Sequence, residues 1–375
     1  FSTGFSVKSN YRISEIRTEV NNTWARKYTL SYTTADNASS TLLNTIVESG
    51  QDDSSNVTTL PAIDFNYATA ATDWTYNSTW DIPIPFMHLG VDVGTRWADI
   101  NGDGLQDLLC HNDKTTGYIC PRSTPLVYLN NGNGFTDVSS TWLFPLDAGG
   151  SGNREAFIDS NYMDLGLRVM DINGDQKADL VRGDGPVKYT YINNGSGWTY
   201  TSSWNLPTYF LWAGVDRGMR MGDINGDGLP DILCHNDSTS TGECPKNTPK
   251  IWLNNGSGFT DVSSTWLFPA KADNGSEVES FLFSSLSDRA LRLVDVNGDG
   301  LSDLVRGDGT ALYTYINNGS GWTYDSSWNL PFPFINGSND SGVRLTDFNG
   351  DGLIDILCHT DNAGGTCGSS NPLAY

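Results

Sequence analysis

The stretch D-I-N-G-D-G-L-Q-D at residues 99–107 occurs five times in this chain, with small changes. The other copies read D-I-N-G-D-Q-K-A-D from Asp171, D-I-N-G-D-G-L-P-D from Asp223, D-V-N-G-D-G-L-S-D from Asp295 and D-F-N-G-D-G-L-I-D from Asp347. Every copy carries a carboxylate or amide side chain at positions 1, 3, 5 and 9. A tandem repeat with an acidic, glycine-containing loop in each unit therefore accounts for most of the chain.

The side chains of this loop suit a calcium ion. Ca²⁺ takes six to eight oxygen ligands at about 2.3–2.6 Å, and a loop with oxygens at positions 1, 3 and 5 wraps around one ion while position 7 adds a backbone carbonyl. We expect up to five Ca²⁺ ions, one in each loop. The candidate ligands are Asp99, Asn101, Asp103, Leu105 and Asp107; Asp171, Asn173, Asp175, Lys177 and Asp179; Asp223, Asn225, Asp227, Leu229 and Asp231; Asp295, Asn297, Asp299, Leu301 and Asp303; and Asp347, Asn349, Asp351, Leu353 and Asp355.

Position 6 of the loop needs a positive φ, which glycine adopts without steric cost. Gly104, Gly228, Gly300 and Gly352 meet this requirement, whereas Gln176 does not, which predicts a weaker second site. The alternative is a set of unoccupied hairpin turns whose acids are solvated. Five copies in phase favour calcium.

The spacing of the loops predicts the architecture. Their starts are separated by 72, 52, 72 and 52 residues, so two unit types alternate with a period of 124. Both types break into four short strand-like runs between Gly, Asn and Pro, without helical periodicity. Such units repeated in tandem are typical of a β-propeller. We predict an all-β fold with four-stranded blades; five blades are favoured because the two ends of the chain together have the length of one blade, and six or seven stay open.

Residues 1–62 lack the loop motif and form a separate segment. Residues 11–20, 24–33 and 42–48 alternate in polarity, which predicts three strands. Residues 63–375 are assigned to the propeller.

The propeller would be closed by strands from both ends of the chain. The sequence W-T-Y-N-S-T-W-D-I-P at residues 74–83 matches W-T-Y-T-S-S-W-N-L-P at residues 198–207. We therefore expect residues 63–67 and 74–76 to be closing strands of a blade.

These repeats resemble the FG-GAP or VCBS repeats of integrin α-subunit propellers and many bacterial surface proteins. The resemblance covers about residues 63–375. It rests on the five loops, on the D-L-V-R-G-D-G continuations at Asp179 and Asp303, and on N-N-G-x-G turns that begin at Asn130, Asn193, Asn254 and Asn317. It implies a non-catalytic scaffold whose calcium loops hold the blades, with function on exposed faces or fused domains. Residues 46–50 and 60–67 are also similar to the segment leading into the propeller of the SpvB and TcB toxin-component proteins.

The six cysteines fall into pairs at equivalent places: Cys110 with Cys120, Cys234 with Cys244, and Cys358 with Cys367. An even count in register indicates three local disulfides and an oxidising compartment. The alternative is a soft-metal site with the adjacent His111, His235 and His359. It is disfavoured because neighbours on a strand point to opposite faces.

The charge argues against nucleic acid as a partner, and the hydropathy argues against a membrane-spanning helix. The chain has 22 basic and 44 acidic residues and a net charge of −22, which argues against binding nucleic acid. No run of about 18 apolar residues is present, so no membrane-spanning helix is expected.

Three further patterns each allow two interpretations. The R-G-D tripeptides at Arg182 and Arg306 could mediate adhesion, but the repeat itself requires an acidic turn there. Long connectors at residues 146–167 and 270–291 are expected to be exposed loops that could form a partner surface; they carry Glu155, Asp159, Asp164, Glu277, Glu279 and Asp288. Asn-x-Ser/Thr sequons would make a glycoprotein only in a host that glycosylates.

Tryptophans recur at one place in the units. They could stack on sugars, although packing between blades is favoured. The residues are Trp80, Trp142, Trp204, Trp266 and Trp328.

Together these patterns predict an extracellular or cell-surface, calcium-stabilised, disulfide-bonded β-propeller. It would be a non-catalytic binding or structural module of a surface or secreted assembly, with protein subunits or glycans as partners. It could be a fibre subunit if residues 1–9 add as a strand to the edge of a neighbour. The alternatives are a lectin-like propeller, or the scaffold part of a toxin complex or of a polysaccharide-active enzyme.

Overall fold

The structure is a computed structural model, and it is all-β in the part that it describes. That part comprises residues 12–20, 23–34, 41–52, 54–65, 81–88, 91–114, 120, 123–238, 244, 246, 248–273, 275, 277–309, 311–337, 339–346, 353–358 and 373–374. The helices described are two single 3-10 turns, η2 (Ser202–Trp204) and η3 (Ser326–Trp328). No helix in these ranges is long and apolar enough to cross a membrane.

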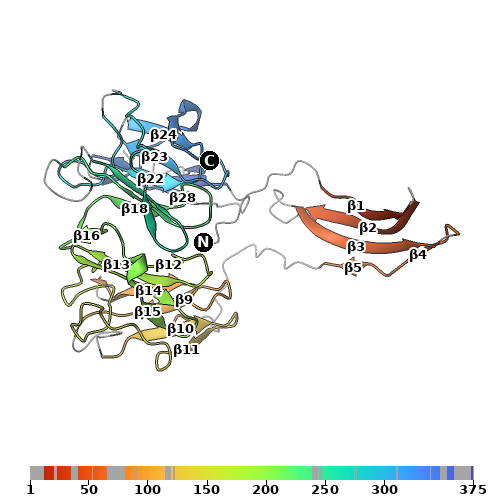
Figure 1. The fold of residues 1–375 in the computed structure, drawn as a ribbon, viewed down its shortest axis with the longest axis horizontal. Coiled ribbons are helices and arrows are strands. Elements are labelled where there is room, and N and C mark those ends of the chain that lie inside the picture. Colours follow the sequence, from red (N-terminus) through yellow and green to blue (C-terminus); the bar gives the residue numbers. More distant parts are fainter. Residues whose placement is uncertain are drawn as a thin grey trace.

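The first sheet confirms the three strands predicted before the repeats. Its strands are β1 (Glu15–Val20), β2 (Thr23–Thr34), β3 (Thr41–Gln51), β4 (Val57–Thr59) and β5 (Ile63–Asp64). They run in the order β1-β2-β3-β4, and β5 also pairs with β3. The sheet stands apart from the repeats (Figure 1). The assignment of residue 63 onward to the propeller was wrong for β5, because Ile63 pairs with Ile46 of β3.

Four sheets each contain the four antiparallel strands expected of a blade. Blade 1 is β8 (Thr95–Ala98), β9 (Asp107–Cys110), β10 (Leu126–Asn130) and β11 (Phe135–Asp137). Blade 2 is β12 (Leu167–Met170), β13 (Asp179–Asp184), β14 (Val187–Asn193) and β15 (Trp198–Tyr200). Blade 3 is β18 (Met219–Gly222), β19 (Asp231–Cys234), β20 (Lys250–Asn254) and β21 (Phe259–Asp261). Blade 4 is β22 (Leu291–Val294), β23 (Asp303–Asp308), β24 (Ala311–Asn317) and β25 (Trp322–Tyr324).

Three strands of a fifth blade are described. They are β28 (Val343–Thr346), β29 (Asp355–Cys358) and β30 (Leu373–Ala374). The predicted closing strand at residues 74–76 lies outside the described residues, so the count of five blades stays a prediction.

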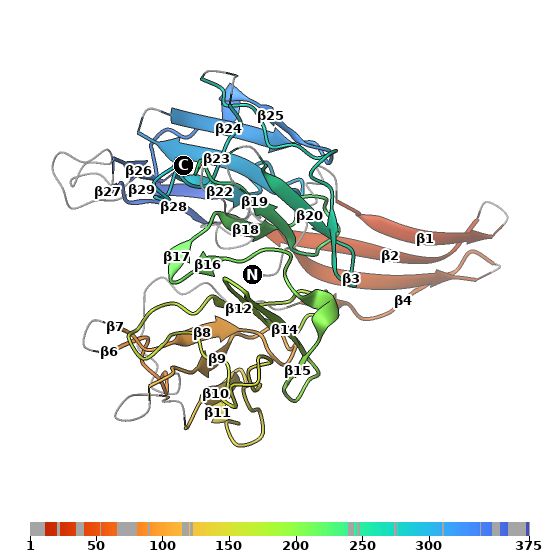
Figure 2. The ribbon, with the colours of Figure 1, turned by 60° about the vertical axis from the view of Figure 1, so that its left-hand side comes forward.

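Among the described strands, short hairpins precede the first, third and fifth blades but not the second and fourth, which confirms that two unit types alternate. They are β6 (Met87–His88) with β7 (Val91–Asp92), β16 (Leu211–Trp212) with β17 (Val215–Asp216), and β26 (Ile335–Asn336) with β27 (Asn339–Asp340). The β16 and β26 strands join the sheets of blades 2 and 4 in parallel with β13 and β23. Hairpins β6–β7 and β26–β27 lie on the side away from β1–β4 in Figure 2.

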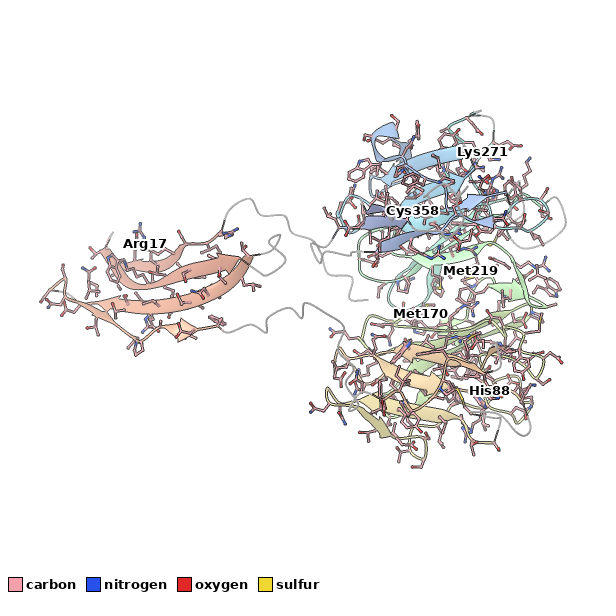
Figure 3. The ribbon with its side chains drawn as sticks, turned by 180° about the vertical axis from the view of Figure 1, so that it is seen from behind. Arg17, His88, Met170, Met219, Lys271 and Cys358 are labelled. Carbon is pink, nitrogen blue, oxygen red and sulfur yellow. A yellow bond between two sulfur atoms is a disulfide. The ribbon has the colours of Figure 1, made fainter. Side chains whose placement is uncertain are left out.

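The cores lie between successive blades. Leu109 of blade 1 shares a buried cluster with Leu180 of blade 2, and Leu233 of blade 3 shares one with Leu304 of blade 4. A third cluster joins blades 2 and 3, where Met219 is buried beside the half-buried Met170 (Figure 3). Each blade is therefore stabilised by burying its faces against its neighbours.

The tryptophans that follow the outer strands contribute to these cores, as predicted. The rings of Trp142 and Trp198 are 6.0 Å apart, as are those of Trp266 and Trp322. Trp204 lies 6.2 Å from Phe259 of the next blade. Trp328 differs because its side chain is 43% exposed. Trp80 lies outside the described residues.

The long connectors are exposed only in part, at turns such as those containing Leu146 and Met163, and their central residues are buried. Glu155 of the first and Glu279 of the second are buried at 2% and 0% exposure. Glu279 accepts hydrogen bonds from Arg306, at 3.1 Å, and from the Tyr315 hydroxyl, at 2.7 Å. A buried charge needs a partner of opposite sign, so this contact fixes the connector to the strand that carries the R-G-D tripeptide.

The same contact removes the adhesion interpretation of both R-G-D tripeptides. Arg182 and Arg306 lie within β13 and β23 rather than at the tip of a turn. Arg182 donates to Glu155 at 2.6 Å, and the Arg306 side chain is 5% exposed. The guanidinium groups of Arg182 and Arg306 bind buried glutamates, so they are not available to bind a receptor.

The structure forms two of the three predicted disulfides, Cys110–Cys120 and Cys234–Cys244. Cys367 lies outside the described residues, so the third pairing stays a prediction. His235 is buried, and its Nδ1 lies 2.6 Å from the carbonyl oxygen of Glu279. His111 makes the equivalent contact with Glu155. These histidines hold the connectors, which argues against the soft-metal alternative.

Candidate calcium loops

The acidic loops join the first and second strands of each blade. In blades 1 to 4, positions 1 to 8 form the turn and position 9 begins the second strand, at Asp107, Asp179, Asp231 and Asp303. The fifth loop lies largely outside the described residues, which include only Leu353 and Asp355 of its candidate ligands. The repeat therefore places one equivalent loop at the same end of each described blade.

The carboxylate at position 1 organises the turn. Asp99 accepts hydrogen bonds from the backbone N–H groups of Gly102 at 2.7 Å, Asp103 at 3.2 Å and Gly104 at 2.8 Å. Equivalent backbone N–H groups donate to the position-one carboxylates of the next three loops, which are Asp171, Asp223 and Asp295. A carboxylate that accepts several backbone hydrogen bonds holds the chain in a tight turn around its oxygens.

Positions 3 and 5 tighten the same turn. The side-chain oxygen of Asn101 accepts from the N–H of Asp103 at 2.9 Å, and Asp103 accepts from the N–H of Leu105 at 2.8 Å. Short polar side chains that bond to the backbone two residues on are common in turns. These contacts bring the oxygens of positions 1, 3 and 5 onto one short loop.

The carboxylate at position 9 ties the loop to the third strand of its blade. One oxygen of Asp107 accepts from the N–H of Ile100 at 3.0 Å, and the other accepts from the N–H of Asn130 at 2.7 Å. Blades 2, 3 and 4 repeat both contacts through Asp179, Asp231 and Asp303. Position 9 is thus a structural tie as well as a candidate ligand.

These position-nine aspartates are also buried charges. All four are fully buried, and none forms a salt bridge within the described part of the chain. Burial raises the pKa of Asp107 to about 6 and that of Asp231 to about 7; backbone hydrogen bonds oppose the rise, and the like charges at positions 5 and 1 add to it. The pKa values of Asp179 and Asp303 are likewise raised to about 7. Within the described residues, no basic side chain offsets these four carboxylates.

The donors of each loop fit Ca²⁺. They are carboxylate and amide oxygens, the ligands preferred by hard divalent cations, without the thiolate or imidazole groups that select softer metals. Within the described residues, no three His, Cys, Asp or Glu side chains are already gathered as a metal-binding group. The fit therefore rests on the chemistry of the donors and on the uncompensated carboxylates.

The second loop departs from the others in two ways. Gln176 adopts a φ of 68°, in the same left-handed region as Gly104 at 85°. A residue with a Cβ is strained in this region by roughly 1–2 kcal/mol. The Nζ of Lys177 lies 3.6 Å from Asp175, so this loop already contains a positive charge.

A contact between blades passes through the loops. The side-chain amide of Asn193 in blade 2 donates to the carbonyl oxygen of Ile100 in the first loop, at 2.7 Å. Asn254 and Asn317 make the same bond to Ile172 and Ile224 of the preceding blades. These asparagines begin the N-N-G-x-G turns that the sequence displayed, but their role could not be read from one unit alone.

A second repeated feature was missed from the sequence, although its signal is there. Seven residues before each loop an Asp begins the pattern D-x-G-x-R, with Ala for Gly in one copy, and its carboxylate pairs with the Arg four residues on. The N–O distances are 3.0 Å for Asp92–Arg96, 2.8 Å for Asp164–Arg168, 2.8 Å for Asp216–Arg220, 2.6 Å for Asp288–Arg292 and 2.8 Å for Asp340–Arg344.

In blades 1 to 4 the arginine also lies over a phenylalanine of the following connector. The guanidinium-to-ring distances are 5.3 Å for Phe157, 5.2 Å for Phe210, 5.4 Å for Phe281 and 5.6 Å for Phe334. Such cation–π contacts stabilise modestly. The first strand of each blade is thereby linked to the connector that leads to the next blade.

Comparison with known proteins agrees with this organisation. The family model of the FG-GAP-like repeat matches residues 99–181, 171–234 and 295–358, which is more than half of the chain. No curated protein matches the sequence.

Several solved structures are similar at low identity. One is the Tc holotoxin pore of Photorhabdus luminescens (18% identity, 92% of this chain and 14% of that chain, TM-score 0.41). Another is a lectin of Agrocybe aegerita that recognises non-reducing terminal N-acetylglucosamine (19% identity, 89% and 74%, TM-score 0.44). A third is the Vibrio cholerae biofilm matrix protein Bap1 (15% identity, 72% and 35%, TM-score 0.29). The chain spans about one seventh of the length of the Photorhabdus chain.

Proposed function

Because the chain belongs to the family of FG-GAP-like repeat proteins, we propose that it is a calcium-stabilised β-propeller scaffold, a non-catalytic binding or structural module of an extracellular assembly. Calcium would occupy the acidic loops and stabilise the junctions between blades. Protein subunits or glycans would bind on the exposed faces.

The observation that carries this proposal is the set of buried position-nine aspartates. An ionised carboxylate without a cation is costly to bury, and Asp107, Asp179, Asp231 and Asp303 each lie near two further acidic side chains of their loop. A bound Ca²⁺ supplies the missing positive charge. Each ion would offset two of the 22 excess negative charges of the chain.

The residues of the chain explain why such a site would be structural. In each loop, positions 1, 3, 5 and 9 would hold the ion. Position 9 is tied to the third strand of its own blade, and the carbonyl oxygen of position 2 accepts a bond from the next blade. Fixing the loop therefore fixes the junction between two blades.

The extracellular placement is supported by the cysteines. Cys110, Cys234 and their partners are buried and disulfide-bonded, and structural disulfides persist mainly in oxidising compartments. The non-catalytic assignment is supported by His111 and His235, whose ring nitrogens hold backbone carbonyl groups of the connectors.

The test is the gain in melting temperature that calcium gives. Asp107→Asn removes one loop carboxylate, whereas Asp137→Asn removes an exposed carboxylate from the last strand of the same blade and serves as a control. We expect calcium to raise the melting temperature of the wild type and of Asp137→Asn equally, and that of Asp107→Asn less. Equal gains in all three proteins, or no gain in the wild type, would contradict the proposal.

A further inference from the structure

The first sheet has an apolar face. Tyr28, Leu30 and Tyr32 alternate along β2 and therefore point to the same side. In the strand register, Ile16 stands opposite Tyr28, and Ile46 stands opposite both Leu30 and Ile63. Residues directly opposite each other on paired strands share a face. The apolar face is defined by Ile16, Tyr28, Leu30, Tyr32, Ile46 and Ile63.

The opposite face is rich in hydroxyl groups. Ser31 lies opposite Thr45 with their hydroxyl oxygens 2.7 Å apart, and Ser49 lies opposite Thr59 with theirs 2.9 Å apart. These hydroxyl groups satisfy one another's hydrogen bonds, and Ser49 is itself buried at 5% exposure. The sheet is therefore amphipathic, with the period-two pattern of a sheet that buries one side.

At one end of the apolar face the guanidinium of Arg12 lies 5.7 Å from the centre of the Tyr32 ring, and no described blade packs on the face. The five buried clusters contain no residue before Ile84. Ile16 and Ile63 are 50% and 59% exposed. Figures 1 and 3 show the sheet, with Arg17 on it, standing apart from the blades. Tyr28, Leu30, Tyr32 and Ile46 between them are half-buried. A partly exposed apolar surface of this kind marks an interaction site.

The distribution of charge indicates which partner fits. The residues up to Phe65 hold five basic and seven acidic side chains, a net charge of −2, so the remainder of the chain holds −20. Two copies of the repeat region repel each other strongly, whereas two copies of this sheet repel each other only weakly. A strongly basic partner would be drawn to the repeats instead.

The edge of the apolar face is self-complementary. Glu48 stands opposite Tyr28, and Arg26 precedes Tyr28 by two residues, so Glu48 and Arg26 both lie on this face. The Nε of Arg26 lies 3.2 Å from a carboxylate oxygen of Glu48. A surface that presents both signs of charge beside apolar side chains can meet its own copy across a two-fold axis, since each positive group can face a negative one.

We propose that the apolar faces of two copies of this chain pack against each other as a β-sandwich. Facing sheets pack about 10 Å apart with interdigitated side chains. The two repeat regions would then point away from the shared sandwich, which keeps their negative charges apart. This inference goes beyond the scaffold role and does not depend on calcium.

Sedimentation equilibrium of the full chain tests it. The wild type is expected to be a dimer that dissociates on dilution. Leu30→Lys and Ile46→Lys place a charge on the apolar face and should give monomers. Thr29→Lys and Thr45→Lys place the same charge on the hydroxyl-rich face of the same strands, and they should remain dimeric. A monomeric wild type, or equal effects of the two pairs, would overturn the proposal.

Two further measurements separate misfolding and strand addition from the proposed contact. Hydrogen exchange of the unmodified wild type should show amide protection in β1–β3 that falls on dilution, and protection that is independent of concentration would count against the dimer. A variant that lacks residues 1–9 should still dimerise. Its conversion to monomers would show that strand addition at an edge, rather than face packing, joins the copies.

Discussion

At the scale of single residues, Gln176 is the clearest departure from the repeat. It adopts a left-handed φ of 68° where the other four loops have glycine. Gln176→Gly should therefore stabilise the protein, by roughly 0.5–1 kcal/mol, because the strain of the Cβ that it removes exceeds the entropy that a glycine loses on folding. Urea denaturation measures the change. Gln176→Ala keeps the strain and is the control; an equal gain from both variants would contradict this reason.

The same loop predicts unequal effects of two equivalent aspartates. Asp223 organises a loop with glycine at position 6, whereas Asp171 organises the loop that contains Gln176 and Lys177. We expect Asp223→Ala to lower the melting temperature in calcium more than Asp171→Ala does, since the second loop holds its ion less tightly. Equal losses of melting temperature would show that Gln176 and Lys177 do not weaken the second site.

Arg306 and Glu279 form a buried ion pair whose removal should be costly. Arg306→Ala leaves Glu279 charged and buried without its partner, which typically destabilises by about 3–5 kcal/mol. Arg344→Ala breaks an exposed pair with Asp340 and should cost at most about 1 kcal/mol. Chemical denaturation of both variants checks the contrast. A loss at Arg306 no larger than at Arg344 would show that Glu279 is not held as an ion.

At the scale of elements, local patterns predicted the strands well and the connectors poorly. The alternation in β1–β3 and the polar loop before each second strand can be read within a few residues. Glu155 could not be placed in this way, because its partner Arg182 is 27 residues away, in a different strand. The boundary at residue 63 failed for the same reason, since β5 pairs back with β3 across a turn.

The Asp288–Arg292 pair predicts how stability depends on pH. Burial raises the pKa of Asp288, but hydrogen bonds and charge from Arg292 outweigh it, so the pKa lies below its ordinary value. In the acid range the unfolded chain then binds more protons than the folded one, so this contribution is present above about pH 4 and is lost as the pH falls further. Asp288→Asn should flatten the fall in urea midpoint between about pH 5 and pH 3. An unchanged slope would contradict this role.

At the scale of the whole molecule, the repeat made the fold of each blade predictable, but it did not predict the contacts that join one blade to the next. Five loops with alternating spacing indicated blades of two types, and the structure has four complete blades that follow this order. The candidate loop residues were found from sequence because they are contiguous. The bond from each Asn to the preceding blade could not be found, because the residues it joins, such as Asn193 and Ile100, are 93 positions apart.

The whole-molecule account depends on calcium as the missing counter-charge. Four buried aspartates without cations and a net charge of −22 should make the metal-free protein markedly less stable. A site held at a hundred times its dissociation constant contributes about 2.7 kcal/mol. Several such sites would dominate the free energy of unfolding.

The most direct test is one thermal unfolding experiment on the chain in excess calcium and in excess chelator. We predict that the chelator lowers the melting temperature by at least about 5 °C, since each 1 kcal/mol shifts the melting temperature by roughly 2–4 °C in a domain of about 150–250 residues. Identical unfolding curves in the two conditions would contradict the claim that calcium in the acidic loops holds the blades together.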